Sequence, residues 1–453
     1  MDVSFAAGNS GQPSQVTGVG RVITELARQI THFSDLTVSS VGCFGGDWNP
    51  IFTDVQTGRW VEQVLGGSPP FRPCYKSRLG ISGRFSSFYA DWSLRGTVNR
   101  DHRRSSWCRT LNLLTRSLRR LLEADSRPGV GFEDVDVFIS TFRPPPRWLP
   151  ADLPRVVFIY DVYPLHFPQE AGLSVTGMLE QVLGSIVPSR DIIMVNSNFT
   201  RDDFCKLTGY PPDRVHVAYL AADERFKPVT DSISIERVRK KYQIGKQPYC
   251  LSVANPQPRK DLNTAIRAFA AAARAMPEWD GQMVLAGNPM AGWGYESVRA
   301  TIAEFPELAN RILSIGTVAE EDLPTIYSGA LTLIFPSRFE GFGLPVLEAM
   351  SCGVPVISSN ATSLPEVGGN APIYCAPGDV DVFARAVVSL ARDSARCKQM
   401  REAGLGQAAR FSWNQAADRV RDAILHAVGE PLELQPSNVG DDGVFRGQRN
   451  ALN

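Results

Sequence analysis

A chain of 453 residues is too long for one compact core, since single domains usually hold about 100–200 residues. Its 47 basic and 47 acidic side chains cancel, which argues against a protein that coats nucleic acid. Hydrophobic residues make up 43% and charged residues 21%, a balance that is ordinary for a folded chain and excludes wholesale disorder.

The eight cysteines are widely spaced and none forms a C-x-x-C pair, so we expect reduced thiols rather than a disulfide framework or a zinc site. The N-terminus lacks the basic and apolar regions of a signal peptide, and no run reaches the roughly 18 apolar residues of a membrane span. These features predict a cytoplasmic protein, with peripheral contact to the inner face of the cell membrane left open.

Short apolar runs alternate with amphipathic stretches from the N-terminus onward. The first series of expected buried strands comprises residues 3–7, 37–43, 135–140, 155–160, 192–196 and 215–220. Helices are expected between them, at 19–30 and 199–207. Strands that alternate with helices predict a parallel sheet with helices on both faces.

A second series of the same kind follows. Its expected strands are 249–253, 282–286, 312–315, 331–335 and 355–358, separated by helices at about 262–275, 321–328, 345–351 and 382–392. The fold class is therefore α/β, with two doubly wound, Rossmann-like parallel-sheet domains facing a cleft.

These patterns suggest where the domains begin and end. We expect an N-terminal domain at 1–223 with an insertion at about 50–125, a polar linker at 224–246 and a C-terminal domain at 247–428. A last helix at 414–428 follows the second sheet, and its packing back on the N-terminal domain is one alternative. The polar tail, 429–453, has no periodic pattern and is expected to be disordered.

Residues 71–120 carry twelve lysine and arginine side chains against Asp91 and Asp101, a net charge of +10 that leaves −10 for the rest of the chain. Aromatic residues are interleaved with these cations, a combination that suits an anionic membrane surface or a diphosphate-lipid-linked saccharide. The alternative is a solvated basic insertion whose leucine stripe at 111–122 belongs to a core.

The strongest candidate for chemistry is the pair Glu340 and Glu348, which are separated by seven residues. Gly341 and Gly343 lie between them, and Pro345 suits the first turn of a helix. Free amides at such a helix start attract anions, and parallel sheets bind ligands at the carboxyl ends of their strands. The alternative is an ordinary strand–turn–helix connection with two solvated glutamates.

The block around this pair, residues 335–356 (FPSRFEGFGLPVLEAMSCGVPV), closely resembles the retaining glycosyltransferases of family 4, which have the GT-B fold and a Glu-x7-Glu hallmark. Further segments resemble the same family, at 195–201, 223–228, 253–262, 316–324, 363–368 and 377–379. Together they extend over most of residues 1–30 and 155–425. The resemblance implies an acceptor-side N-terminal domain and a C-terminal domain that binds a nucleotide sugar.

The resemblance also assigns residues to the donor. It implies donor contacts at Gly18, Gly20, Val318, Gly341, Phe342, Gly343, Leu344 and Glu348. Gly18 and Gly20 belong to a Gly-Val-Gly-Arg turn that is weak evidence on its own, since a plain tight turn explains it equally well. Glu348 is expected to accept hydrogen bonds from ribose hydroxyls, and Glu340 to face the sugar.

Lys260 and Arg259 follow an expected strand and precede a helix. A cation at this position can neutralise charge on a diphosphate leaving group, with Arg259 as a more rigid second donor. The alternative, a solvated pair at a helix start, is disfavoured by the positive end of the helix dipole. In the family that the block resembles, the matching lysine contacts the donor diphosphate, so Lys260, Arg259 and Glu340 are our catalytic candidates.

Tyr160 and Asp161 end a strand and are assigned to the sugar and acceptor side. Many family members have histidine where this chain has Tyr160. His166 is interpreted as a structural or surface residue. Two Asp-x-Asp triplets, at 134–136 and 379–381, are not expected to bind metal. The first precedes an expected strand, and an N-cap role for Asp379 explains the second.

The sequence thus predicts a retaining, metal-independent glycosyltransferase without a cofactor, whose donor is GDP-mannose or another GDP-sugar. The acceptor would be a saccharide or lipid-linked saccharide in polysaccharide, lipopolysaccharide or exopolysaccharide assembly, and no nucleic-acid partner is expected. The alternatives are a catalytically silent nucleotide-sugar-binding scaffold and a GT-B phosphorylase or epimerase.

Overall fold

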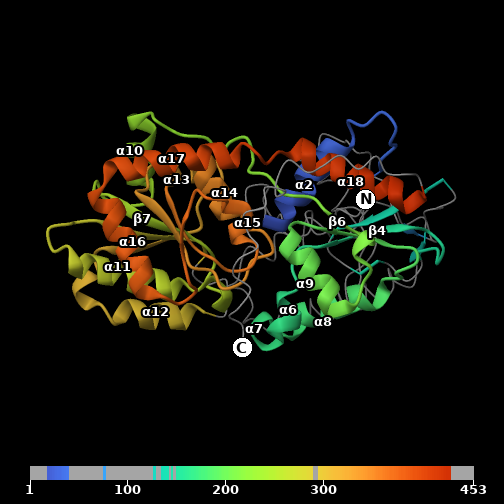
Figure 1. Cartoon of the computed structure of the whole chain (residues 1–453), viewed down its shortest axis with the longest axis horizontal. Helices are drawn as coiled ribbons and strands as arrows, with labels where there is room; N and C mark the ends of the chain where they lie inside the picture. The colour runs from blue at the N-terminus through green and yellow to red at the C-terminus, as the bar shows by residue number, and fades with distance from the viewer. Residues whose placement is uncertain are drawn as a thin grey trace, which may run out of the picture.

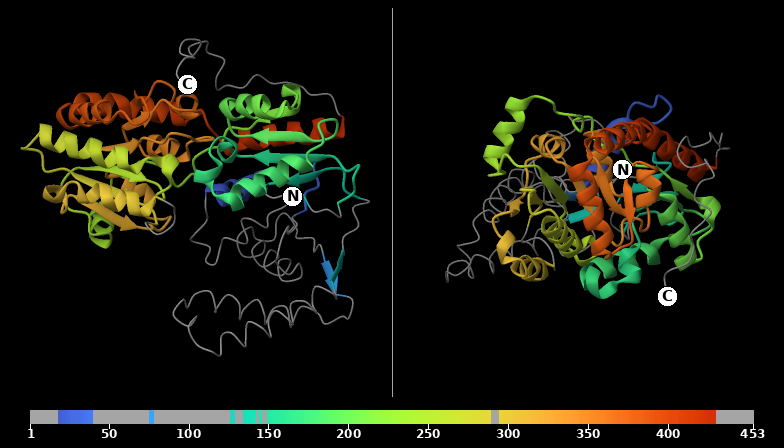
Figure 2. Two further views of the ribbon diagram at one scale, coloured as in Figure 1. Left: turned by 90° about the horizontal axis from the view of Figure 1, so that it is seen from below. Right: turned by 60° about the vertical axis from the view of Figure 1, so that its left-hand side comes forward.

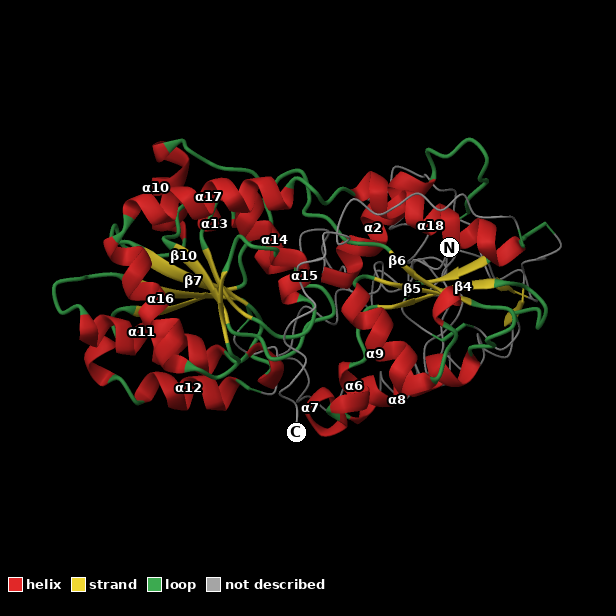
Figure 3. Ribbon diagram, in the orientation of Figure 1, coloured by secondary structure: helices red, strands yellow, loops and turns green. Residues whose placement is uncertain are grey.

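The computed structural model describes residues 18–39, 75–77, 126–128, 134–141, 144–145, 149–288 and 294–429. Two parallel sheets lie side by side, each with helices on both faces (Figures 1 and 3). The expected strand at 3–7 and the tail beyond Gly429 lie outside the described residues. Of the basic segment 71–120, only β1 (Tyr75–Ser77) is described, and it pairs with β2 (Ser126–Pro128). Of the expected strand at 37–43, residues 37–39 are described and form no strand.

The N-terminal sheet is fully parallel. Its strand order is β3 (Phe138–Ser140), β4 (Arg155–Ile159), β5 (Ile192–Val195) and β6 (Val215–Val217). Successive side chains of a strand point to opposite faces, so Val156 packs in one core and Val157 in another. The first core includes α2 (Gly18–Ile30) and α18 (Trp413–Val428); the second includes α8 (Leu173–Ser185) and α9 (Asn198–Thr208).

The C-terminal sheet has six parallel strands, in the order β12-β11-β10-β7-β8-β9. In chain order they are β7 (Tyr249–Val253), β8 (Gln282–Ala286), β9 (Ile312–Gly316), β10 (Thr332–Phe335), β11 (Val356–Ser359) and β12 (Ile373–Cys375). One face packs on α11 (Leu262–Ala275), α12 (Tyr295–Ala303) and α16 (Val380–Arg392). The other packs on α13 (Leu323–Ser328) and α14 (Leu344–Ser351).

Several elements were not expected from the sequence. They are β12, α12, α6 (Tyr163–His166), α7 (Pro168–Ala171), α8, α10 (Ser232–Lys241), α15 (Leu364–Gly368) and α17 (Ser394–Ala408). Helix α10 lies inside the stretch interpreted as a polar linker. It forms because Asp231 caps its first turn and Val238 is buried, while Arg239 donates to the Gly245 carbonyl at 2.6 Å.

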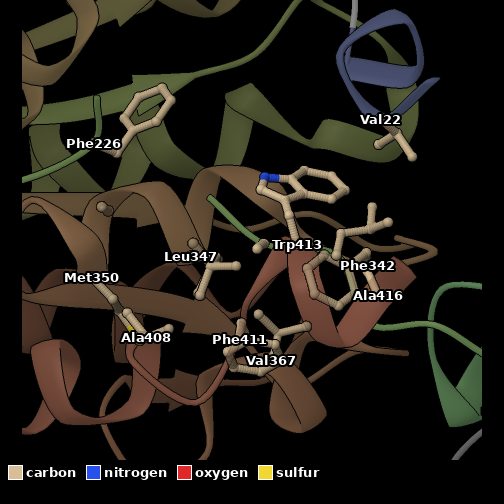
Figure 4. Close-up of a cluster of buried hydrophobic side chains, with 14 of the residues drawn as sticks. Val22, Phe226, Phe342, Leu347, Met350, Val367, Ala408, Phe411, Trp413 and Ala416 are labelled. Atoms are coloured by element: carbon tan, nitrogen blue, oxygen red, sulfur yellow. The ribbon is translucent and has the colours of Figure 1, made fainter. Parts of the chain in front are cut away.

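One hydrophobic core extends from the N-terminal sheet to the C-terminal sheet. Trp413, Phe411 and Phe342 belong to the same cluster as Val22 of α2 (Figure 4). Helix α18 follows the second sheet in the chain but lies beside the first one (Figure 2). Because this core is shared, the loop that contains Phe342 is packed against both halves of the molecule.

A pair of histidines joins β6 to α18, with His216 Nε2 lying 2.9 Å from His426 Nδ1. Burial and the nearby His426 lower the pKa of His216 to about 4. Burial and Arg214 also lower the pKa of His426. As the pH falls from about 6.5 toward 4, the unfolded chain binds protons that the folded chain does not, so stability should fall.

We therefore expect the melting temperature of His216→Asn to depend less steeply on pH between 6.5 and 4 than that of the wild type. The matched control is His32→Asn, which changes an exposed histidine and should keep the wild-type slope. Thermal denaturation at several pH values measures both. Equal slopes for His216→Asn and the wild type would show that the pair does not control acid stability.

Candidate functional site

The Glu340–Glu348 segment forms the loop after β10 and then helix α14. Gly343 is the N-cap of α14 with φ +111°, a conformation that L side chains rarely adopt, and a Cβ there would lie 2.6 Å from Leu364. A Cβ on Gly341 would lie 1.9 Å from the Tyr160 carbonyl oxygen, which belongs to the other half of the molecule. The two glycines therefore permit this turn and its close approach to the end of β4.

Lys260 and Arg259 lie in a short 3-10 helix, Pro258–Lys260, between β7 and α11. The Lys260 Nζ lies 2.5 Å from Glu340 Oε1, and the Arg259 Nη1 lies 3.5 Å from Glu340 Oε2. The Arg259 carbonyl accepts hydrogen bonds from Arg338 N at 2.7 Å and from Ser337 Oγ at 3.0 Å. The structure thus brings together all three residues that the sequence proposed as catalytic.

In this cluster two cations, Lys260 and Arg259, face the carboxylate of Glu340. That side chain is buried, since Glu340 is only 6% exposed. Burial alone would raise the pKa of Glu340, but Lys260 and Arg259 outweigh it and hold that pKa below its ordinary value. Glu340 is therefore an anion at neutral pH. An anionic ligand that approached Glu340 would find both of its cationic partners, Lys260 and Arg259, beside it.

Asp161 brings the N-terminal sheet to the same cluster. Its Oδ2 lies 3.5 Å from Arg259 Nη1, and its Oδ1 accepts a hydrogen bond from Tyr163 N at 3.2 Å. The Tyr163 ring lies 5.4 Å from the Arg259 guanidinium carbon. The Tyr160 hydroxyl oxygen is buried, and burial raises the pKa of Tyr160, so this group remains a phenol.

Glu348 lies one helical turn beyond the glycine loop and is 4% exposed. Its Oε1 is 2.5 Å from Arg21 Nη1, and its Oε2 accepts a hydrogen bond from Tyr327 at 3.0 Å. Arg21 also lies 3.5 Å from Glu320. Sequence reasoning did not single out Arg21, although it directly follows Gly20 in the Gly-Val-Gly-Arg turn.

The remaining predicted donor residues lie on several elements. Gly18 and Gly20 are in the first turn of α2, and Gly20 is buried. Val318 follows β9 and packs partly buried against the shared core. Phe342 is buried in that core, and Leu344, the first residue of α14, packs against it.

Two further residues that sequence reasoning missed hold the loop of Glu340 in place. Thr362 Oγ1 accepts a hydrogen bond from Glu340 N at 3.0 Å. Ser363 Oγ lies 2.9 Å from the carbonyl oxygens of both Glu340 and Phe342. Thr362 has φ +53°, an uncommon value for a β-branched residue. The sequence signal that could have indicated both residues is the family-like block 363–368, which begins at Ser363 and directly follows Thr362.

A cavity of about 400 Å³ lies at the carboxyl ends of β7 and β8. Ala254, Pro256, Gly287 and Tyr295 are among its lining residues. Parallel sheets bind ligands at this edge, and Pro256 and Leu262 of the lining flank Lys260 in the sequence.

Two sequence interpretations of other polar residues can be compared with the structure. Asp379 caps α16 by accepting a hydrogen bond from Val382 N at 3.0 Å, as expected. His166 is exposed, pairs with Asp203 at 2.8 Å and packs its ring 5.6 Å from Phe339, which fits a structural or surface residue. Among the residues that the structure describes, no three His, Cys, Asp or Glu side chains form a group that could hold a metal ion.

Residues 234–407 match the family model for glycosyl transferases group 1. The chain is also 32% identical over 284 residues to the O-antigen chain mannosyltransferase B of Escherichia coli, a match covering 62% of this chain and 73% of that protein. The chain belongs to the group 1 glycosyltransferases. The prediction of a glycosyltransferase is therefore confirmed.

Other relatives of this glycosyltransferase are also mannosyltransferases. The serotype-specific mannosyltransferase WbdA of Escherichia coli is 30% identical over 54% of this chain, and the match covers only 30% of that longer protein. The GDP-mannose-dependent alpha-(1-6)-phosphatidylinositol monomannoside mannosyltransferase of Mycobacterium tuberculosis is 28% identical over 56% of this chain and 67% of its own length.

Solved structures confirm the fold class. Anabaena Alr3699/HepE in complex with UDP and glucose superposes with a TM-score of 0.58 at 16% identity, over 92% of this chain and 97% of that one. WaaG, a glycosyltransferase involved in lipopolysaccharide biosynthesis, superposes with a TM-score of 0.57 at 14% identity, over 90% and 96%. No helix in the described part of this glycosyltransferase is both long and apolar enough to cross a membrane.

Proposed function

We propose that this glycosyltransferase moves mannose, or another hexose, from a GDP-sugar to a saccharide hydroxyl with retention of the anomeric configuration. The observation that carries the proposal is the convergence of Lys260 and Arg259 on the buried Glu340, where the two sheets meet. The relatives' names support mannose, and one of them specifies GDP-mannose. The name of the O-antigen chain mannosyltransferase favours O-antigen or related polysaccharide assembly.

The charges at this site suit departure of a diphosphate. As the bond between the sugar C1 and the phosphate oxygen breaks, positive charge develops on the sugar and negative charge on the leaving group. Lys260 and Arg259, together with the amides at the start of α14, would bind that negative charge. We propose that these groups, rather than a bound metal ion, stabilise the leaving diphosphate.

Retention follows from attack on the face that the diphosphate leaves. In this route the acceptor oxygen bonds to C1 as the C1–phosphate bond breaks, and the acceptor proton passes to the leaving phosphate oxygen. The carboxylates nearest Arg259 are Glu340 and Asp161, and both lie 3.5 Å from its guanidinium. Because cations compensate them, they are poorer nucleophiles, which favours front-face attack over a glycosyl-enzyme intermediate.

A membrane surface and the acceptor are the further partners that we propose. The +10 segment at 71–120 would bind an anionic membrane surface or the diphosphate of a lipid-linked saccharide, which agrees with a cytoplasmic, peripheral enzyme. The competing hypothesis, a catalytically silent nucleotide-sugar-binding scaffold, predicts donor binding without product.

The donor base can be tested by thermal shift with GDP, UDP, ADP and TDP. We expect GDP to raise the melting temperature most, because at equal concentration the nucleotide with the lowest Kd stabilises the native state most. A ligand at 100 times its Kd contributes about 2.7 kcal/mol. The other three nucleotides at the same concentration are the controls. A larger shift with UDP would overturn the GDP assignment, and no shift with any nucleotide would overturn the donor site.

A further inference from the structure

A carboxylate from the C-terminal half caps a helix of the N-terminal half. Glu366 of α15 accepts hydrogen bonds from Asn198 N at 2.7 Å and Phe199 N at 3.1 Å, which are the first two amides of α9. Ser197 caps the next amide, Thr200 N, at 3.0 Å. Helix N-terminal amides have no partner within the helix, so the negative charge of Glu366 satisfies two of them and complements the helix dipole.

Tyr219 adds a third donor to the same carboxylate. Its hydroxyl donates to Glu366 Oε1 at 2.5 Å and accepts from Asn198 Nδ2 at 2.5 Å. Burial and the charge of Glu366 raise the pKa of Tyr219, so the hydroxyl stays protonated. The Tyr219 ring packs 6.4 Å from Phe342 and 5.9 Å from Phe411, which connects this contact to the shared core.

The first turn of α9 also touches the loop of Glu340. The Gly341 carbonyl accepts from Ser197 Oγ at 2.7 Å and lies 3.2 Å from Thr200 Oγ1. On the other side of the loop, Ser363 bonds the Glu340 carbonyl and directly precedes α15. Helix α9 and the Glu340 loop are therefore joined twice, once through Gly341 and once through α15 and Glu366.

We propose that Glu366 is a positioning residue for sugar transfer, whose carboxylate holds α9, and with it the Ser197 and Thr200 hydroxyls that contact Gly341, in register with the Glu340 loop. This inference rests on the function proposed above. The chemistry requires a carboxylate, because all three partners of Glu366 donate hydrogen bonds. A glutamine has one acceptor oxygen and an amide group that would face a donor.

The test compares Glu366→Gln and Tyr219→Phe with the wild type in steady-state transfer from GDP-mannose to a saccharide acceptor. A small misplacement of reacting groups lowers turnover, so we expect kcat of Glu366→Gln to fall roughly ten- to a hundredfold. Tyr219→Phe, which keeps the ring contacts, should lose less. The donor KM and the thermal shift with GDP should stay near wild type, because Lys260, Glu340 and Glu348 are unchanged.

The matched control is Glu304→Gln, which removes a carboxylate from an exposed ion pair with Arg267 and should keep the wild-type kcat. A kcat for Glu366→Gln near that of the control would overturn the inference. So would a fall in kcat that is accompanied by a loss of donor affinity and of melting temperature, because that pattern indicates a general structural defect. If Glu366→Gln does not fold, Tyr219→Phe decides: reduced kcat with unchanged donor KM supports the inference, and wild-type kcat overturns it. Failure of the proposed function is distinct, because the wild type itself would then form no product from GDP-mannose.

Discussion

Replacing Lys260 with alanine is expected to lower kcat of sugar transfer by about 10²–10³-fold, the usual effect of removing one preorganised group that stabilises transition-state charge. The Lys260 Nζ lies 2.5 Å from Glu340, in the cluster where Arg259 lies 3.5 Å from both Glu340 and Asp161. The loss should appear in kcat more than in the donor KM, because charge on the diphosphate increases as the sugar leaves. Steady-state release of nucleoside diphosphate measures both constants.

The fold of Lys260→Ala should persist, because Arg259 still compensates Glu340. Removing one partner of a buried ion pair does cost stability, so the melting temperature must be measured alongside activity. Lys241→Ala is the matched control, since Lys241 forms an equally short ion pair, with Asp322, but is half exposed. Wild-type turnover by a folded Lys260→Ala variant would remove Lys260 from the catalytic residues.

Gly341→Ala should produce the second large loss. An added Cβ would lie 1.9 Å from the Tyr160 carbonyl oxygen and 3.0 Å from Asp161 Cβ, so either the loop or the end of β4 must move. Backbone atoms cannot yield as a flexible side chain can. A displacement of about 1 Å between reacting groups costs roughly 10²-fold in rate, and we expect a loss of that order in kcat.

The matched control for this variant is Gly406→Ala. Gly406 lies in α17, where a Cβ would meet nothing within 4 Å, and alanine inside a helix is more stable than glycine by about 0.5–1 kcal/mol. Its activity should be that of the wild type, with an equal or higher melting temperature. If Gly341→Ala kept full activity and stability, the close approach of the loop to Tyr160 would not matter for transfer.

Buried, strongly patterned elements were predictable from the sequence. Strand β7 and helix α11 have the predicted bounds, because each has an apolar run or stripe that a sheet or helix must bury. Strand β12 was missed, since its three residues provide little pattern. Helix α10 was missed because its charged sequence has only one buried apolar side chain, and its stability depends on the Asp231 cap and on tertiary contacts.

The contacts of the candidate site were likewise predictable only in part. The convergence of Lys260 with Glu340 followed from the rule that loops at the carboxyl ends of parallel strands meet. The partners Arg21 and Glu366 did not follow, because their contacts join residues 327 and 168 positions apart. Each partner nevertheless lies in a segment that the sequence had singled out, so only its pairing required the structure.

The central claim is that sugar transfer takes place where Lys260 and Arg259 converge on Glu340. Its most direct test is proton NMR of the reaction of GDP-mannose with a saccharide acceptor, run with wild type and Lys260→Ala under identical conditions. We expect the wild type to form a product with the anomeric configuration of the donor, and Lys260→Ala to form it at about 1% of that rate or less. An inverted product, or equal rates for the two proteins, would contradict the claim.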